Sequence, residues 1–170
     1  MSEAVERKFD IGDKVVHPQH GVGYVSDVEE KQFEPKISRT YYVVSIPDTT
    51  LWVPVDLSSS GLRKLSAKTD LEKCRQILLS APTVLKPDRG LMASLIDHIR
   101  QGTIIGHCEV VRDLAAYGWH KSLFGPLSDF RQTTFDVLCQ EWAAVEGVPE
   151  TDASYEIDTL LRKGRSVYEN

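Results

Sequence analysis

The sequence has few cysteines and no long apolar run, which argues against a disulfide-rich, a metal-cluster and a membrane-spanning protein. Cys74, Cys108 and Cys139 are odd in number and widely spaced, which indicates neither a disulfide framework nor a metal cluster, so we predict reduced thiols in a core. No apolar run reaches the roughly 18 to 20 residues needed to cross a membrane. The opening segment MSEAVERKF lacks the apolar centre of a signal peptide. We therefore expect a cytoplasmic protein without membrane contact.

Positive charge is also in short supply. The 170 residues contain 20 Lys and Arg against 25 Asp and Glu, which gives a net charge of −5. Such a balance excludes a general, whole-surface attraction to nucleic acid and leaves only local basic patches open. The length is sufficient for a real core, in either one domain or two small ones.

Patterns typical of catalysis are missing as well. The sequence pairs no nucleophile with a base and contains no glycine loop that would hold a phosphate. His17 and His20 flank Pro18, but no third ligand follows at the spacing of a metal site. We predict that the protein is not an enzyme and that it uses no metal, no cofactor and no small-molecule substrate.

The first half of the chain is instead rich in strand signals. The stretch Phe9–Gln32 (FDIGDKVVHPQHGVGYVSDVEEKQ) has β-branched and aromatic residues interrupted by Pro18, Gly21 and Gly23, which predicts two strands joined by a turn. Further strands are expected at 38–46, 50–55 and 62–65, and Pro54 suits an edge strand because it cannot donate to a ladder. Five short antiparallel strands over residues 1–66 predict a partly open SH3-like or Tudor-like barrel.

After Ser66 the pattern changes to helical periodicity. Thr69, Asp70 and Glu72 resemble a capping box at the start of a helix that Pro82 ends. Four more helices are expected at 88–101, 104–117, 128–146 and 152–163. Each of these is followed by a glycine, the favoured C-cap: Gly102, Gly118, Gly147 and Gly164. We predict an all-α bundle of about five helices over residues 69–170, and so an α+β chain of two domains.

Four segments together carry a family resemblance. The stretches GDKVVHPQHGVGYV, LWVPV, GLRKL and EVVRDL resemble the CarD/CdnL family of bacterial RNA polymerase-binding transcription regulators, and the likeness covers nearly the whole chain. It implies that the Tudor-like domain, shared with the transcription-repair coupling factor, binds the β subunit of RNA polymerase. It also implies that the helical domain contacts promoter DNA at the upstream edge of the melted region and modulates the stability of the open complex.

The resemblance implies a polymerase contact on the barrel, formed by Lys31, Gln32, Phe33 and Trp52. An exposed aromatic beside a basic residue is a plausible binding hot spot, because aromatic side chains bury much area at modest entropic cost. The alternative is that Phe33 and Trp52 fill the barrel core. Alternation of Trp52 with Leu51 and Val53 sends one set inward and the other outward, so the sequence leaves both readings open.

The helical half departs from the family pattern. Relatives carry a tryptophan followed by arginines at the start of the second helix, and this tryptophan wedges into the minor groove; here Asp88 and Arg89 stand there. Asp88 cannot stack and is repelled by phosphate. From Thr69 onward 11 Lys and Arg face 15 Asp and Glu, a net charge of −4. We expect promoter DNA binding to be weak and polymerase-dependent. The candidate DNA-binding residues are Lys86, Arg89, Arg100 and Arg112.

Two functions therefore stay open. The first is a polymerase-bound transcription regulator whose helical domain touches promoter DNA, which a positive face gathering the four candidate cations would favour. The second is a protein-interaction adaptor that docks on polymerase but uses its acidic helical domain to bind another protein. Trp119, which precedes His120 and Lys121, is either a substitute wedge or a packing anchor.

Overall fold

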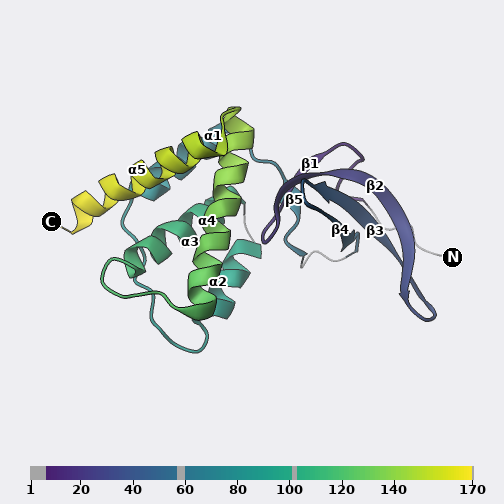
Figure 1. Cartoon of the computed structure of the whole chain (residues 1–170), viewed down its shortest axis with the longest axis horizontal. Helices are drawn as coiled ribbons and strands as arrows, with labels where there is room; N and C mark the ends of the chain where they lie inside the picture. The colour runs from purple at the N-terminus through teal and green to yellow at the C-terminus, as the bar shows by residue number, and fades with distance from the viewer. Residues whose placement is uncertain (1–6, 57–59, 101–102, 170) are drawn as a thin grey trace. The chain divides into compact units, whose positions relative to one another are not determined.

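The computed structural model describes residues 7–56, 60–100 and 103–169, and the chain divides into two compact units. The unit Met1–Leu65 contains a five-stranded antiparallel sheet, and the unit Ser66–Asn170 contains five helices (Figure 1). Strands and helices are thus segregated along the chain. The α+β class predicted from the sequence is confirmed.

The sheet is built from strands that follow one another in sequence. They are β1 (Lys14–His17), β2 (Gly21–Glu34), β3 (Ile37–Ile46), β4 (Thr49–Pro54) and β5 (Arg63–Lys64). The spatial order is β4-β3-β2-β1-β5, so β4 and β5 are the two edges. Pro54 ends an edge strand, as expected of a residue without an amide donor.

A bulge in β2 sets which side chains enter the core of the sheet unit. The β2–β3 register shifts between Val25 and Asp27, and such an inserted residue changes the alternation of faces along a strand. Val25 is fully buried and Val28 also packs against the core, although the two are three residues apart. The remaining core residues come from all parts of the unit: Phe9, Val15, Tyr42, Val44, Val53 and Leu62. The result is a curved, barrel-like sheet around one apolar cluster.

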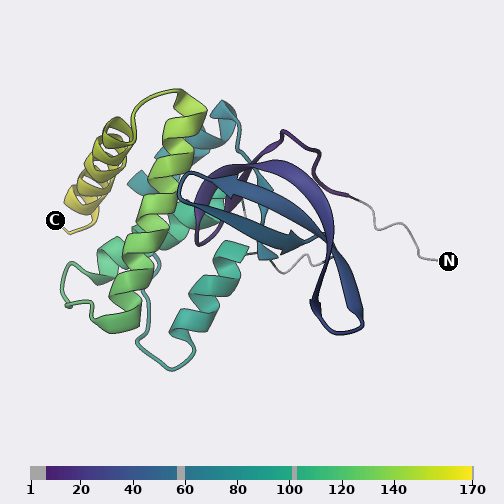
Figure 2. The same cartoon turned by 45° about the vertical axis from the view of Figure 1, so that its right-hand side comes forward.

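The helices are α1 (Lys68–Leu79), α2 (Leu91–Arg100), α3 (Ile104–Tyr117), α4 (Gly125–Glu146) and α5 (Glu150–Tyr168). Helix α3 packs against α1, α2 and α4, and α5 packs against α1 and α4 (Figures 1 and 2). The main core is centred on Trp142 and includes Leu71, Leu78, Ile104, Leu138 and Ile157. A second cluster, Leu95, Ile99, Val110 and Leu114, joins α2 to α3.

Several helix starts differ from the sequence prediction. The Asp70 carboxylate accepts a hydrogen bond from the Ala67 amide at 3.0 Å, so α1 begins at Lys68 and the prediction that Thr69 caps it is wrong. Helix α2 starts at Leu91, three residues later than expected, and α4 starts at Gly125, three residues earlier. Pro126 lies in the first turn of α4, where a missing amide costs no hydrogen bond.

The glycines after the helices divide into different roles. Gly147 is a left-handed C-cap with φ of 71°, as predicted, whereas Gly118 follows α3 with an ordinary φ of −72°. Gly164 lies inside α5, where an added Cβ would come within 2.9 Å of the Leu78 carbonyl oxygen. Gly164 is therefore a close-packing residue, and the expected end of this helix at residue 163 is wrong. Gly102 lies outside the described residues.

All three cysteines are free and buried in the helical unit. Burial raises the pKa of the Cys139 thiol to about 12, so this thiol stays neutral and unreactive near pH 7. The prediction of reduced core thiols is confirmed. In the described ranges no group of three or more His, Cys, Asp or Glu side chains could hold a metal ion. None of the helices there is long and apolar enough to span a membrane.

Candidate functional site

The outward face of strands β2 to β4 carries a cluster of exposed aromatic and charged side chains. Leu51 and Val53 pack with the barrel core, and Trp52 between them is 39% exposed. The Lys31 Nζ lies 4.6 Å from the centroid of the Trp52 ring. Glu29 contacts both partners, at 3.6 Å from Lys31 Nζ and 3.5 Å from Trp52 Nε1. Trp52 therefore belongs to this outer sheet face and not to the core.

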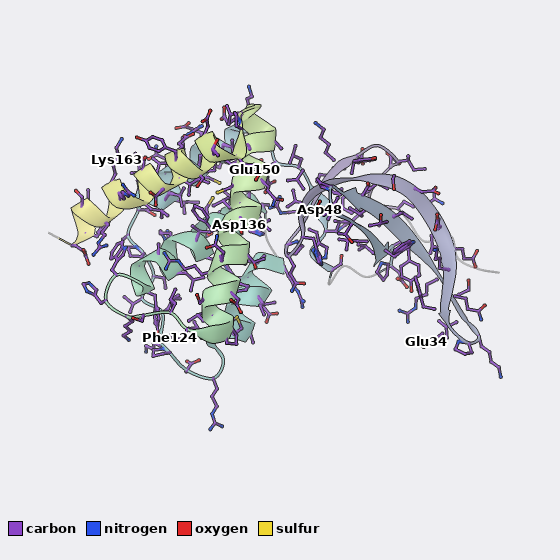
Figure 3. All side chains as sticks on the ribbon, in the orientation of Figure 1. Glu34, Asp48, Phe124, Asp136, Glu150 and Lys163 are labelled. Carbon is purple, nitrogen blue, oxygen red and sulfur yellow. The ribbon has the colours of Figure 1, made fainter. Side chains whose placement is uncertain are left out.

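A second aromatic pair continues this outer sheet face toward the end of the β2–β3 hairpin, where Figure 3 labels Glu34. Phe33 is 61% exposed and makes a T-shaped contact with the Tyr41 ring, with the ring centroids 5.2 Å apart. Gln32 is exposed and lies in an irregular part of β2, where the register shifts between Lys31 and Glu34. The core alternative for Phe33 is excluded by its exposure.

Cross-strand pairing explains why these residues meet. Glu29 is opposite Tyr41 in the β2–β3 ladder, and Trp52 is opposite Val43 in the β3–β4 ladder. Residues opposite one another on neighbouring strands place their side chains on the same face. Glu29 and Tyr41 were not predicted as members of the site, because the register that brings them there is a property of the folded sheet.

The arrangement suits the binding of another macromolecule rather than chemistry. Lys31 is held by the Trp52 ring and the Glu29 carboxylate, so part of its rotamer entropy is already lost before a partner arrives. Trp52 and Phe33 offer apolar area that a partner can cover. Tryptophan is among the residue types enriched at the energetic centres of protein interfaces, so Trp52 is the strongest candidate anchor of this face.

The cation predicted on α3 is largely buried and held by neighbouring side chains. The Arg112 side chain is only 12% exposed; its Nε lies 2.9 Å from Asp113 Oδ1, and its Nη1 lies 2.9 Å from Ser80 Oγ. Asp113 also accepts a hydrogen bond from the Thr83 amide at 2.9 Å. Arg112 thus fastens the segment after α1 to α3. It contributes little to any exposed positive surface.

The other three predicted cations are exposed but separated along the chain. Lys86 and Arg89 lie in the segment before α2, and Arg100 is the last residue of this helix. A helix of this length spans about 15 Å, so Arg89 and Arg100 flank its opposite ends. The described structure therefore places exposed predicted cations before α2 and at its last residue.

Comparison with known proteins supplies the decisive observation. Residues 9–66 match the CarD-like/TRCF RID domain, and all four predicted contact residues of the outer sheet face lie within this match. A protein of Bacillus subtilis (strain 168), named "Putative transcription factor YdeB", is 30% identical over 146 residues, covering 84% of this chain and 95% of the relative. The chain belongs to the CarD/CdnL family. The resemblance seen in the sequence is thereby confirmed, and this CarD-like protein is a transcription regulator whose first domain is of a type that implies interaction with RNA polymerase.

In this CarD-like protein Asp88 has a local structural role. Its Oδ1 accepts a hydrogen bond from the Gly90 amide at 2.9 Å, and its carbonyl oxygen accepts one from the Leu91 amide at 3.3 Å. A side-chain carboxylate that accepts from the amide two residues later forms an Asx turn, here in the segment just before α2. The sequence signal for this role is an aspartate at the expected start of an apolar helical run, whereas the prediction for Asp88 concerned the loss of a stacking wedge and repulsion by phosphate.

Proposed function

We propose that this CarD-like protein docks on the β subunit of RNA polymerase through the outer sheet face of its barrel-like domain. The observation that carries the proposal is the exposed contact of Lys31 with Trp52, backed by Glu29, inside the matched domain. Phe33 extends the same surface toward the hairpin end through its contact with Tyr41, and we include the exposed neighbouring Gln32 as a further contact. A partner with an apolar patch and a nearby carboxylate would complement this surface.

Loss of Lys31 and Trp52 is expected to weaken polymerase binding without unfolding the barrel. Both side chains are more than a third exposed, so the double variant Lys31→Ala/Trp52→Ala should keep its Tm. Each hot-spot anchor contributes about 2 kcal/mol of binding, or about thirtyfold in Kd. Titration of the isolated β subunit by calorimetry measures the change.

Ile11→Ala is the matched control for this experiment. This variant removes the Ile11 side chain, which is 61% exposed and lies in the segment before β1. It should leave the affinity for the β subunit unchanged. An unchanged affinity of the double variant would remove Lys31 and Trp52 from the docking surface. A Tm that falls with the affinity would assign them a structural role instead.

We further propose that the helical domain touches promoter DNA at the edge of the melted region and modulates open-complex stability. Lys86, Arg89 and Arg100 are its exposed candidate contacts. With a net charge of −4 from Thr69 onward, free duplex DNA should bind no tighter than about 10⁻⁴ to 10⁻⁶ M. Docking of the barrel on polymerase raises the local concentration, so such weak contacts act only on the assembled complex.

A second candidate function is favoured by the burial of Arg112. Because this cation is held by Asp113 and Ser80, the positive face that would best support DNA contact is incomplete. In this candidate the protein is an adaptor: the barrel docks on polymerase, and the acidic helical domain binds another protein.

The lifetime of the open complex separates the two candidates. If Arg89 contacts DNA near the fork, Arg89→Ala should shorten the lifetime severalfold in a competitor-challenged decay assay, since one phosphate contact is lost. Arg162→Ala, which removes an 80% exposed cation from α5, is the control and should have no effect. A wild-type protein that binds polymerase but leaves the lifetime unchanged would favour the adaptor.

A further inference from the structure

An apolar pocket opens on the helical unit. It has a volume of about 250 Å³ and lies between the segment after α1 and the end of α3. Its walls are predominantly apolar, formed by Pro82, Val84, Leu85, Ala116, Tyr117 and Trp119. Val84 is 85% exposed at this pocket. A pocket of this size accommodates one large apolar side chain.

Cations cover the rings that form the pocket wall. The Lys121 Nζ lies 5.2 Å from the centroid of the Tyr117 ring, and the Arg165 guanidinium carbon lies 5.3 Å from that of Trp119. His120 also lines the pocket. Two basic side chains therefore line an apolar hollow and a third, Arg165, lies over one of its aromatic walls, within a unit that is acidic as a whole.

This cationic rim already holds one carboxylate of the chain. Glu169 Oε2 lies 2.6 Å from Arg165 Nε, and its Oε1 lies 2.7 Å from His120 Nε2. The hydrogen bond to Arg165 holds the pKa of Glu169 below its usual value. Within the described residues Lys121 has no carboxylate within ion-pair distance, so its charge is available to a partner. These contacts show that the basic side chains beside the pocket can bind a carboxylate.

The geometry disfavours nucleic acid as the occupant. Base stacking needs an open aromatic face, whereas Trp119 is half-buried and has Arg165 over its ring. This also makes Trp119 a wall of the pocket rather than a wedge for the DNA fork. A long polyanion would in addition meet the net negative charge of the unit. A short acidic segment needs only the local cations.

We propose that this pocket binds an acidic peptide segment of a partner protein, with one apolar side chain in the hollow and flanking carboxylates on Lys121 and Arg165. The inference deepens the adaptor candidate, because it names the site and the chemistry of the second partner. It does not depend on polymerase docking, which occurs in the other unit. A partner carboxylate would compete with Glu169 for Arg165 and His120.

The test uses the full chain and short fluorescein-labelled acidic peptides that differ only at a central residue, which is leucine, phenylalanine or serine. Fluorescence anisotropy should show binding of the leucine or phenylalanine peptide at least about tenfold tighter than the serine peptide, because serine leaves the hollow unfilled. Lys121→Glu should weaken this binding about tenfold by rim repulsion. Glu169→Gln should strengthen it severalfold, because the competing carboxylate is neutralised.

Lys163→Glu is the matched control, since it makes the same charge change at an exposed position of α5 (Figure 3). It should leave peptide affinity unchanged. Val84→Glu places a carboxylate at the exposed pocket mouth and gives a second, fold-neutral loss of binding.

No binding by either apolar peptide, or equal effects of Lys121→Glu and Lys163→Glu, would overturn the proposal. Tighter binding of a single-stranded DNA oligonucleotide would assign the pocket to nucleic acid instead. If the peptide experiment fails but the protein still binds the β subunit, the pocket proposal is wrong and the polymerase-docking proposal is unaffected.

Discussion

Replacement of Arg75 by methionine is expected to lower the free energy of unfolding of the helical unit by about 3 kcal/mol. Arg75 on α1 bonds Glu156 of α5 at 2.6 Å, Glu146 of α4 at 2.9 Å and Glu72 of its own helix at 3.2 Å. Its guanidinium also lies 5.3 Å from the centroid of the Trp142 ring in the main core. One side chain therefore links three helices.

The expected loss is large because the carboxylates remain after the cation is removed. Glu146 and Glu156 are 25% and 39% exposed, and without Arg75 they would be two partly desolvated like charges near one another. Glu156 also accepts a hydrogen bond from Trp142 Nε1 at 3.2 Å, which holds it in place. The hydrogen bond to Glu156 contributes most to raising the pKa of Arg75 above its ordinary value, while burial acts against it.

Urea unfolding followed by far-ultraviolet circular dichroism measures the effect of Arg75→Met. Arg162→Met is the control, because Arg162 makes one ion pair, with Asp158 at 2.8 Å, and is 80% exposed. Exposed pairs of this kind contribute about 0.5 kcal/mol or less. If the two variants lose equal stability, the Arg75 cluster does not link the helices in the way that its geometry indicates.

Gly23→Ala is expected to destabilise the barrel-like unit by about 3 kcal/mol. A Cβ at this position would overlap the Ser45 carbonyl oxygen and would lie 2.9 Å from Ile46 Cγ1. The obstacle is backbone, which cannot rotate aside as a side chain can. Gly23 is opposite Val15 in the β1–β2 ladder, and the next residue, Tyr24, is opposite Ser45 in the β2–β3 ladder. Any shift would therefore disturb both ladders.

A loss of this size removes a large part of the stability of so small a unit and should lower its Tm by more than about 10 °C. Thermal unfolding followed by circular dichroism is the measurement, with β-subunit binding as a second readout. Gly90→Ala is the matched control, because the atom nearest to its added Cβ is Asp88 Oδ1, at 3.5 Å. The control should change stability by no more than about 0.5 kcal/mol. A Gly23→Ala variant as stable as the control would show that β2 and β3 can separate at this point.

The proposed polymerase-docking surface and the proposed peptide pocket lie in different units and differ in shape. The outer sheet face is a set of exposed rings and a fixed cation on a sheet, whereas the pocket is a hollow with basic side chains on its rim. Lys31→Ala/Trp52→Ala and Lys121→Glu therefore alter binding surfaces in separate units. Each should remove one interaction and leave the other intact.

Local signals in the sequence predicted most elements because local chemistry decides them. The turn between β1 and β2 contains Pro18, which fixes its own φ, and is followed by Gly21 with φ of 91°, a conformation that favours glycine. The left-handed cap at Gly147 follows the same rule. Apolar residues at helical spacing likewise predicted that α3 would span Ile104–Tyr117, and it does.

Positions where segments distant in sequence meet could not be predicted in this way. Gly164 resembled a helix end, but the close approach of α1 makes it an interior residue of α5. Arg112 resembled an exposed cation, yet Ser80 and Asp113 enclose it once α3 packs beside the end of α1. Both outcomes depend on contacts between residues more than thirty positions apart.

The sequence by itself determined the two-part α+β organisation, the family and the residues from which a polymerase contact would be built. The organisation follows from periodicity and turn chemistry, which are local along the chain. The family follows from a resemblance carried by short segments with a glycine and proline pattern, and the expected contact residues are what that resemblance implies. Only the tertiary structure decided that Trp52 faces outward against Lys31 and Glu29, and that Trp119 lines a pocket beneath Arg165. The physical reason is that strand register, bulges and helix crossings determine which face of a residue remains accessible, and these arise only when distant segments pack together.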